Sequence, residues 1–124
     1  MIQIGCRERR VFSLEEAREI LPLLIKITEE AQYQVRVLTH QLQLIKAGDE
    51  LGLKSLESRI QKLIEKWQSK VESLGAEPKG LWIVDFDHGS GYFCWKFPEP
   101  TIFFCHGYQD GFQSRRHVGD VQLN

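Results

Sequence analysis

The stretch "LWIVDFDHGSGYFCWKFPEPTIFFCH", residues 81–106, decides the fold. It contains three runs, residues 81–87, 92–97 and 101–106, that are rich in the aromatic and β-branched residues that favour strands. The connections between them, HGSG and PEP, are short and have the composition of turns. Because such short links join strands that run in opposite directions, we expect an antiparallel meander of three strands.

Side chains on a strand point alternately to its two faces, so the turns decide which residues meet. With HGSG as the first turn, Asp85 faces Cys94. With PEP as the second turn, Cys94 faces Phe104 and Tyr92 faces His106. One face of the sheet then becomes almost wholly apolar, and we expect it to lie on the core. Its members are Trp82, Val84, Phe86, Phe93, Trp95, Phe97, Thr101, Phe103 and Cys105.

The opposite face is mixed, and its polar members are unevenly placed. The whole face comprises Leu81, Ile83, Asp85, Asp87, Tyr92, Cys94, Lys96, Ile102, Phe104 and His106. Five of these gather at the end beside the HGSG turn: Asp85, Asp87, Tyr92, Cys94 and His106. The segment "GYQDGFQSRR", residues 107–116, leaves the third strand at the same end and can fold back over it. This end of the sheet is therefore the candidate site.

The residues before the sheet predict two helices. Ser13 and Glu16 form a capping box, which marks a helix start. Apolar or small residues then recur with alternating gaps of four and three over residues 17–45, and a second such series covers residues 53–74. We therefore predict a long antiparallel helical hairpin, coiled-coil-like, over residues 12–75.

Together these elements predict an α+β fold in a single domain, residues 1–124, with the helical hairpin at 12–75 and the β-meander and C-terminal tail at 80–118. A lone pair of helices buries only one stripe on each helix. Several apolar residues lie off that stripe: Ile20, Leu23, Ile27, Leu44 and Ile64. We expect either the sheet or a second copy of the chain to cover them. Cover by a second copy would make the protein a homodimer, and this is the oligomeric state we predict.

The composition limits the class of partner and the compartment. Sixteen Lys and Arg against 17 Asp and Glu leave a net charge of -1, which disfavours a large nucleic-acid or anionic-membrane surface. The basic cluster "CRERR", residues 6–10, is interpreted as a solvated terminus. No apolar run reaches the ~18 residues of a membrane helix, and no secretory h-region is visible, so we expect a cytoplasmic protein. Cys6, Cys94 and Cys105 form no CxxC pair, which favours reduced thiols.

The candidate catalytic residues are His106, Asp85, Asp87 and Tyr92. His106 can act as a general base that a neighbouring carboxylate orients, while Asp87 can equally bond its own backbone in the turn. Cys94 is a poor nucleophile here, because a nearby carboxylate raises the pKa of a thiol. Asp85, Asp87 and His106 can also hold a divalent metal, but without an HxH or HExxH spacing we assign no metal ligand and no cofactor.

The tail supplies candidate anion ligands. Arg115 and Arg116 can bind a phosphate or carboxylate bidentately, or they can form a salt bridge to Asp85 or Asp110 that fixes the tail. Glu99 lies in the second turn, about 17 Å along the strand from His106. A pair between these two residues is therefore disfavoured within one subunit, although a dimer can bring them together.

Three segments, "FSLEEAREILPLL", "GLWIVDF" and "CWKFPEPTIFFCHGYQDGF..R", resemble the DUF2203 family of small bacterial and archaeal proteins over residues 11 to about 116. The most specific positions are Cys94, Trp95, Glu99, Pro100, His106, Gly111, Phe112 and Arg115. The sequence departs from the family pattern in reading Pro98 before Glu99, and Gly107 where an acidic residue often follows the histidine. The resemblance implies fold and solubility rather than a reaction. The ligand-binding candidates are Arg115, Arg116, Cys94, Trp95, Glu99 and Asp110.

Two functions remain open at this stage. The first is an interaction or scaffold module that dimerises through its helices and binds a small anionic ligand or partner through Arg115 and Arg116. The alternative is a small hydrolase or metal-dependent enzyme that uses His106 with Asp85 and Asp87.

Overall fold

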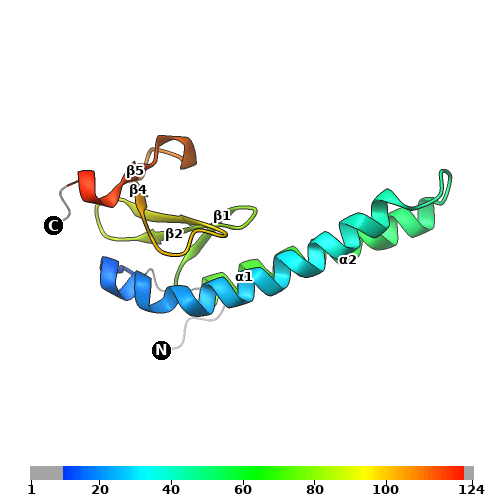
Figure 1. Ribbon diagram of the computed structural model, residues 1–124, viewed down its shortest axis with the longest axis horizontal. Helices are drawn as coiled ribbons and strands as arrows, with labels where there is room; N and C mark the ends of the chain where they lie inside the picture. The colour runs from blue at the N-terminus through cyan, green and yellow to red at the C-terminus, as the bar shows by residue number, and fades with distance from the viewer. Residues whose placement is uncertain (1–9, 122–124) are drawn as a thin grey trace, which may run out of the picture.

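The computed structural model describes residues 10–121 and places a helical hairpin beneath a sheet (Figure 1). Residues 6–9 of the predicted basic cluster lie outside the described residues. The elements are α1 (Leu14–Gln43), α2 (Glu50–Ser73), β1 (Glu77–Gly80), β2 (Ile83–Asp87), β3 (Tyr92–Lys96), β4 (Phe104–His106) and β5 (Arg116–His117), with 3-10 turns η1 (Phe112–Ser114) and η2 (Val118–Asp120). The prediction of an α+β fold with a helical hairpin is confirmed.

Helix α1 begins where the capping box predicts. The Ser13 hydroxyl accepts a hydrogen bond from the Glu16 backbone N–H at 3.1 Å, and the Glu16 carboxylate accepts one from the Ser13 N–H at 2.9 Å. Phe12, just before the cap, is fully buried edge-on against Phe86. The Phe12 N–H also donates to the Asp87 carbonyl at 2.7 Å. The start of α1 is thus bound to the end of β2, next to the candidate site.

Helix α2 starts earlier than its apolar series predicts. Asp49 caps it, since its carboxylate accepts a hydrogen bond from the Gly52 N–H at 2.9 Å, and the helix begins at Glu50 rather than at Leu53. After α2, Gly75 adopts a φ of +89°, a left-handed conformation that a side chain would oppose.

The sheet has five antiparallel strands in the order β1-β2-β3-β4-β5, so the prediction of three strands is wrong. The central three strands have the predicted register, with Asp85 opposite Cys94 and Tyr92 opposite His106. β1 was missed because its sequence, EPKG, reads as a break. As an edge strand, however, β1 can include a proline. β5 has only two residues, too few to show any alternation.

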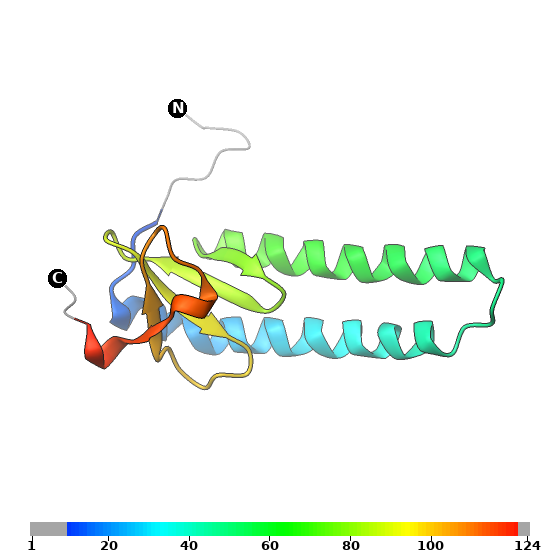
Figure 2. The same ribbon diagram turned by 90° about the horizontal axis from the view of Figure 1, so that it is seen from above.

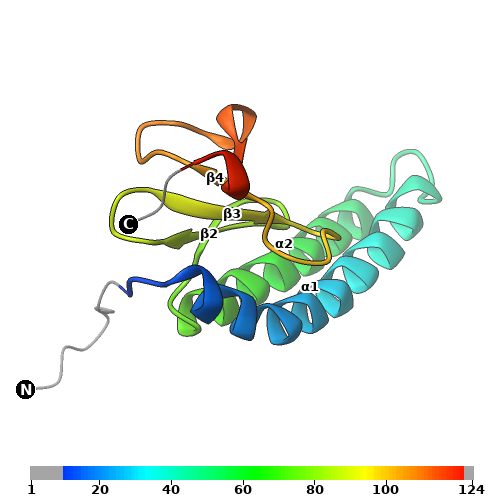
Figure 3. The same ribbon diagram turned by 60° about the vertical axis from the view of Figure 1, so that its left-hand side comes forward.

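The sheet lies across one end of the hairpin (Figures 2 and 3), and its inner face forms the core with the helices. The buried cluster comprises Phe12, Ala17, Leu21, Leu24, Trp67, Val71, Ala76, Val84, Phe86, Phe93, Trp95, Ile102 and Cys105. Within it, the Trp67 indole N–H donates to the Thr28 hydroxyl at 2.8 Å, so both buried polar groups are satisfied.

The face predicted for Ile102 is wrong. Strand alternation predicts that Ile102 lies on the outer face, but its side chain is fully buried in the core. The reason is that β4 begins only at Phe104, so residues 97–103 form a loop to which strand alternation does not apply. The Arg18 guanidinium donates to the Ile102 carbonyl at 2.8 Å and holds this loop on α1.

The far half of the hairpin extends beyond the sheet (Figure 2). Among the described residues between 32 and 66, only Val35 and Leu38 are buried, and the other seam residues are half-buried or exposed. None of the helices described here combines the length and the apolar character needed to cross a membrane.

Candidate functional site

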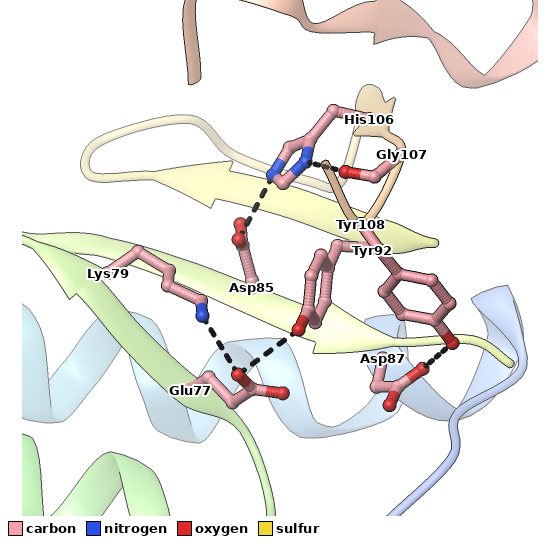
Figure 4. Close-up of polar contacts among 8 residues, drawn as sticks. All are labelled: Glu77, Lys79, Asp85, Asp87, Tyr92, His106, Gly107 and Tyr108. Carbon is pink, nitrogen blue, oxygen red and sulfur yellow. Dashed lines mark hydrogen bonds and ion pairs between the residues drawn. The ribbon is translucent and has the colours of Figure 1, made fainter. Parts of the chain in front are cut away.

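Four of the polar residues predicted to cluster share the outer face at the HGSG end (Figure 4), and the fifth, Cys94, lies opposite Asp85 in the sheet. β2 supplies Asp85 and Asp87, β3 supplies Tyr92 and Cys94, and β4 supplies His106. The His106 Nε2 lies 3.0 Å from the Asp85 Oδ2, with both side chains only 3% exposed. The two residues therefore point to the same side of the sheet, as the alternation predicts.

Both ring nitrogens of His106 are engaged. Nδ1 lies 2.9 Å from the Gly107 carbonyl oxygen. Because a carbonyl can only accept, Nδ1 must carry the proton of this hydrogen bond. Nε2 then faces Asp85. His106 therefore has no free lone pair directed at a substrate, which weakens its predicted role as a general base.

Cys94 completes a three-residue cluster. Its sulfur, an Asp85 oxygen and a His106 nitrogen all lie within 4.8 Å of one another, and all three residues are buried. Burial and, secondly, the charge of Asp85 raise the pKa of the Cys94 thiol to about 12. The Arg115 guanidinium opposes this rise but is outweighed, so Cys94 is a neutral thiol, as expected of a poor nucleophile. We call Asp85, Cys94 and His106 the DCH cluster.

Asp85 is only partly satisfied within this cluster. Burial raises the pKa of its carboxyl group above the usual value, and this effect outweighs the opposing influence of His106. Its second oxygen, Oδ1, is buried and accepts no hydrogen bond from any residue in the described part of the chain. Such an orphaned carboxylate oxygen costs free energy and calls for a ligand or a functional explanation.

Asp87 does not orient His106. Its carboxylate accepts hydrogen bonds from the Gly89 N–H at 2.9 Å and from the Tyr108 hydroxyl at 2.6 Å. It thereby holds the HGSG turn and the start of the following segment, which is the turn role that the sequence left open. Asp85 takes the orienting position instead.

Tyr92 forms one wall of the site. Its ring lies 5.4 Å from the ring of His106, and its hydroxyl approaches Glu77 Oε1 at 3.4 Å. Glu77 also pairs with Lys79 at 3.0 Å (Figure 4). Both residues belong to β1, so sequence reasoning that missed this strand also missed them, and no periodic signal marks them.

Arg115 is paired with Glu99 rather than with Asp85 or Asp110. Its guanidinium donates to both carboxylate oxygens of Glu99, at 3.1 and 2.9 Å. It also lies between the rings of Phe104 and Phe112, 4.2 and 4.0 Å from their centroids. The charge of this arginine is therefore neutralised by a residue of the chain itself. The Lys96 N–H and the Trp95 indole fix Glu99 further, at 2.7 Å each.

Arg116 and Asp110 lie apart from the DCH cluster. Arg116 is exposed and pairs in register with Cys105, on the strand face opposite to that of Cys94. Asp110 accepts a hydrogen bond from the Gly107 N–H at 3.3 Å in a local turn. The geometry thus brings Arg115, and with it Glu99, to Cys94. Trp95 instead faces the core on the inner side of the sheet, and Arg116 and Asp110 do not join the cluster.

A family model described as an uncharacterized conserved protein (DUF2203) matches residues 10–118 of the chain. No curated protein and no solved structure matches it. Four of the positions that gave the sequence resemblance come together in the fold. Cys94 and His106 belong to the DCH cluster, while Glu99 pairs with Arg115, which also contacts Cys94.

Proposed function

Because the chain belongs to the DUF2203 family of uncharacterized conserved proteins, we propose its function from the geometry of the outer face: it binds one divalent transition-metal ion through the DCH cluster. The observation that carries this proposal is the convergence of carboxylate, thiol and imidazole donor atoms within 4.8 Å of one another. The donors come from three neighbouring strands, β2, β3 and β4, so a bound ion would crosslink the centre of the sheet.

The donor types favour a borderline metal such as Zn²⁺, Fe²⁺ or Co²⁺ over Mg²⁺ or Ca²⁺, which prefer oxygen alone. Zinc bonds of about 2.0–2.3 Å place tetrahedral ligand atoms about 3.3–3.8 Å apart. The donors of the DCH cluster therefore need shifts of about 1 Å or less. One carboxylate and one thiolate together carry the two negative charges that balance a divalent ion.

His106 is arranged as a metal ligand usually is. Metal-bound histidines commonly donate their second ring N–H to a carbonyl or carboxylate, which fixes the tautomer and the ring orientation. The Gly107 carbonyl does this at Nδ1 and leaves Nε2 on the side of Asp85 and Cys94. The orphaned Asp85 Oδ1 supports the same reading, since a cation would satisfy it.

The alternative of an anionic ligand has less support. Arg115 Nη1 already donates to both carboxylate oxygens of Glu99, and Arg116 lies on the other face. The burial of the DCH cluster is compatible with metal binding but gives no support to a hydrolytic reaction. Asp85, Cys94 and His106 are 2%, 0% and 6% exposed, so a substrate would reach the ion only if the segment 107–116 moved.

Cobalt titration of the metal-free protein tests the proposal. We expect one Co²⁺ per chain, with a thiolate-to-cobalt charge-transfer band and the strong visible bands of a four-coordinate site. Zn²⁺ should displace the cobalt in competition with a chromophoric chelator. A Cys6→Ser background removes the thiol of the N-terminal segment from the measurement.

Matched variants separate the cluster from its surroundings. Cys94→Ser should abolish the charge-transfer band, and His106→Gln should weaken Co²⁺ binding by at least about a hundredfold. Cys105→Ala, one residue from His106 but on the inner face, should leave both unchanged. Stoichiometric binding that survives Cys94→Ser and His106→Gln, or no binding at micromolar Co²⁺ and Zn²⁺, would overturn the proposal.

A further inference from the structure

A second feature lies on the far half of the hairpin, away from the DCH cluster. A groove of about 550 Å³ runs between α1 and α2, with Tyr33, Val37 and Leu38 on one side and Leu63 on the other. Tyr33 and Val37 are 57% and 38% exposed. Side chains of this kind are normally covered in a helical bundle, so the groove offers an apolar floor that nothing in the described chain covers.

The rim of this groove is basic. Arg59, Lys62 and Lys66 line it from α2, and none of the described residues that line it is acidic. A smaller, more enclosed hollow of about 50 Å³ shares Gln34, Leu63 and Lys66 with the groove and continues towards the sheet, where its lining includes Lys70 and one acid, Glu30. The far half of the hairpin therefore presents one face that is apolar at its centre and strongly positive along α2.

We propose that this groove binds an acidic amphipathic helix of a partner protein, which completes a three-helix bundle with α1 and α2. A third helix is the smallest element that covers a two-helix groove along its length. Its apolar stripe would contact Tyr33, Val37 and Leu63. Acidic residues on either side of that stripe would meet Arg59, Lys62 and Lys66.

The charge distribution also disfavours a second copy that packs α2 against α2 in the groove. A two-fold axis across the helices would bring Arg59, Lys62 and Lys66 of one copy against the same residues of the other. Glu30 is the one acid near this face among the described lining residues, too little to offset them. Like charges at an interface weaken association, whereas an acidic helix meets no such repulsion.

A synthetic peptide serves as the probe. It has about 18 residues, because isolated helices shorter than about 12–15 residues are marginal in water. Leucines with helical spacing form one stripe, and glutamates flank them. A control peptide has the same composition, with the leucines distributed around the helix. Fluorescence anisotropy against the full-length protein should show saturable binding of the striped peptide and at least about tenfold weaker binding of the control, about 1.4 kcal/mol.

Variants of the protein then test each half of the groove. Lys62→Glu with Lys66→Glu, and separately Tyr33→Ser with Val37→Ser, should each weaken binding of the striped peptide at least about tenfold. Lys54→Glu, an exposed lysine outside the groove, is the matched control and should bind like wild type. Circular dichroism confirms that each variant keeps its helices.

Two results would overturn the proposal. One is equal binding of both peptides, or binding that only charge reversal weakens, because either would mean general attraction of anions. The other is a wild-type dimer by light scattering at micromolar concentration that Tyr33→Ser with Val37→Ser makes monomeric, because a second copy would then occupy the groove.

Discussion

The buried pair of Asp85 and His106 illustrates how much depends on single residues in a small sheet. Each group gives up solvation to lie 3% exposed, and each is compensated chiefly by the other. Breaking such a pair by removing one partner leaves a buried polar group without compensation, which costs more than the pair contributes. Since the two residues come from β2 and β4, their contact also holds strands that are not direct neighbours.

His106→Ala should therefore lower the free energy of unfolding of the metal-free protein by about 3 kcal/mol. Adding Asp85→Asn to this variant should recover part of the loss, because the remaining buried group is then neutral. Urea denaturation followed by circular dichroism measures both. Asp110→Asn, an exposed acid, provides the control. If the double variant were less stable than His106→Ala alone, the loss in His106→Ala would not come from an uncompensated buried Asp85.

Cys94 should be almost inert in the folded, metal-free protein. With its pKa raised from 9.0 to about 12, the thiolate fraction at pH 8 falls about a thousandfold, and burial limits access further. Iodoacetamide labelling, followed by tryptic peptide mass spectrometry, should show Cys94 reacting far more slowly in the folded than in the urea-denatured protein. Cleavage after Lys96 separates Cys94 from Cys105. Equal rates in the two states would contradict the burial of this thiol.

At the scale of elements, the sequence was informative where local rules act. Alternation and two short turns were enough to predict the register of β2, β3 and β4, and with it the shared face of Asp85 and His106. It failed for β1, whose sequence EPKG reads as a break although it pairs with the next strand, and for β5, whose two residues show no alternation. The Glu99–Arg115 pair was missed for the same reason: residues 107–116 have no periodicity, so nothing indicates where Arg115 returns to the sheet.

This ion pair joins two irregular segments, the loop at 97–103 and the turn η1, over the outer face. Arg115→Ala should speed backbone hydrogen exchange in residues 97–103 and 112–118 and change β2 and β3 little. Arg116→Ala is the matched control, because Arg116 is the next residue in the sequence and its side chain is exposed. Hydrogen exchange measured by mass spectrometry resolves these segments. An equal effect of the two variants would mean that Arg115 does not hold them together.

At the scale of the whole molecule, the two ends differ in what stabilises them. The sheet end contains the buried cluster and the DCH cluster, whereas the far half of the hairpin buries only Val35 and Leu38 among the described residues from 32 to 66 (Figure 2). Regions with few buried apolar contacts open locally at lower free energy than the core. The uneven burial thus divides the chain into a stable base and a less stable extension, each with its own proposed ligand.

Hydrogen exchange along the hairpin should follow this division. Amides of residues 35–60 should exchange through openings of lower free energy than those of 17–28 and 67–73, because the sheet covers only the latter. Adding Zn²⁺ should slow exchange in β2, β3 and β4 and leave the far hairpin unchanged. The striped acidic peptide should do the reverse, because a ligand stabilises the part of the native structure that it contacts. Protection by Zn²⁺ that extends equally to residues 35–60 would show instead that the two ends unfold as one unit.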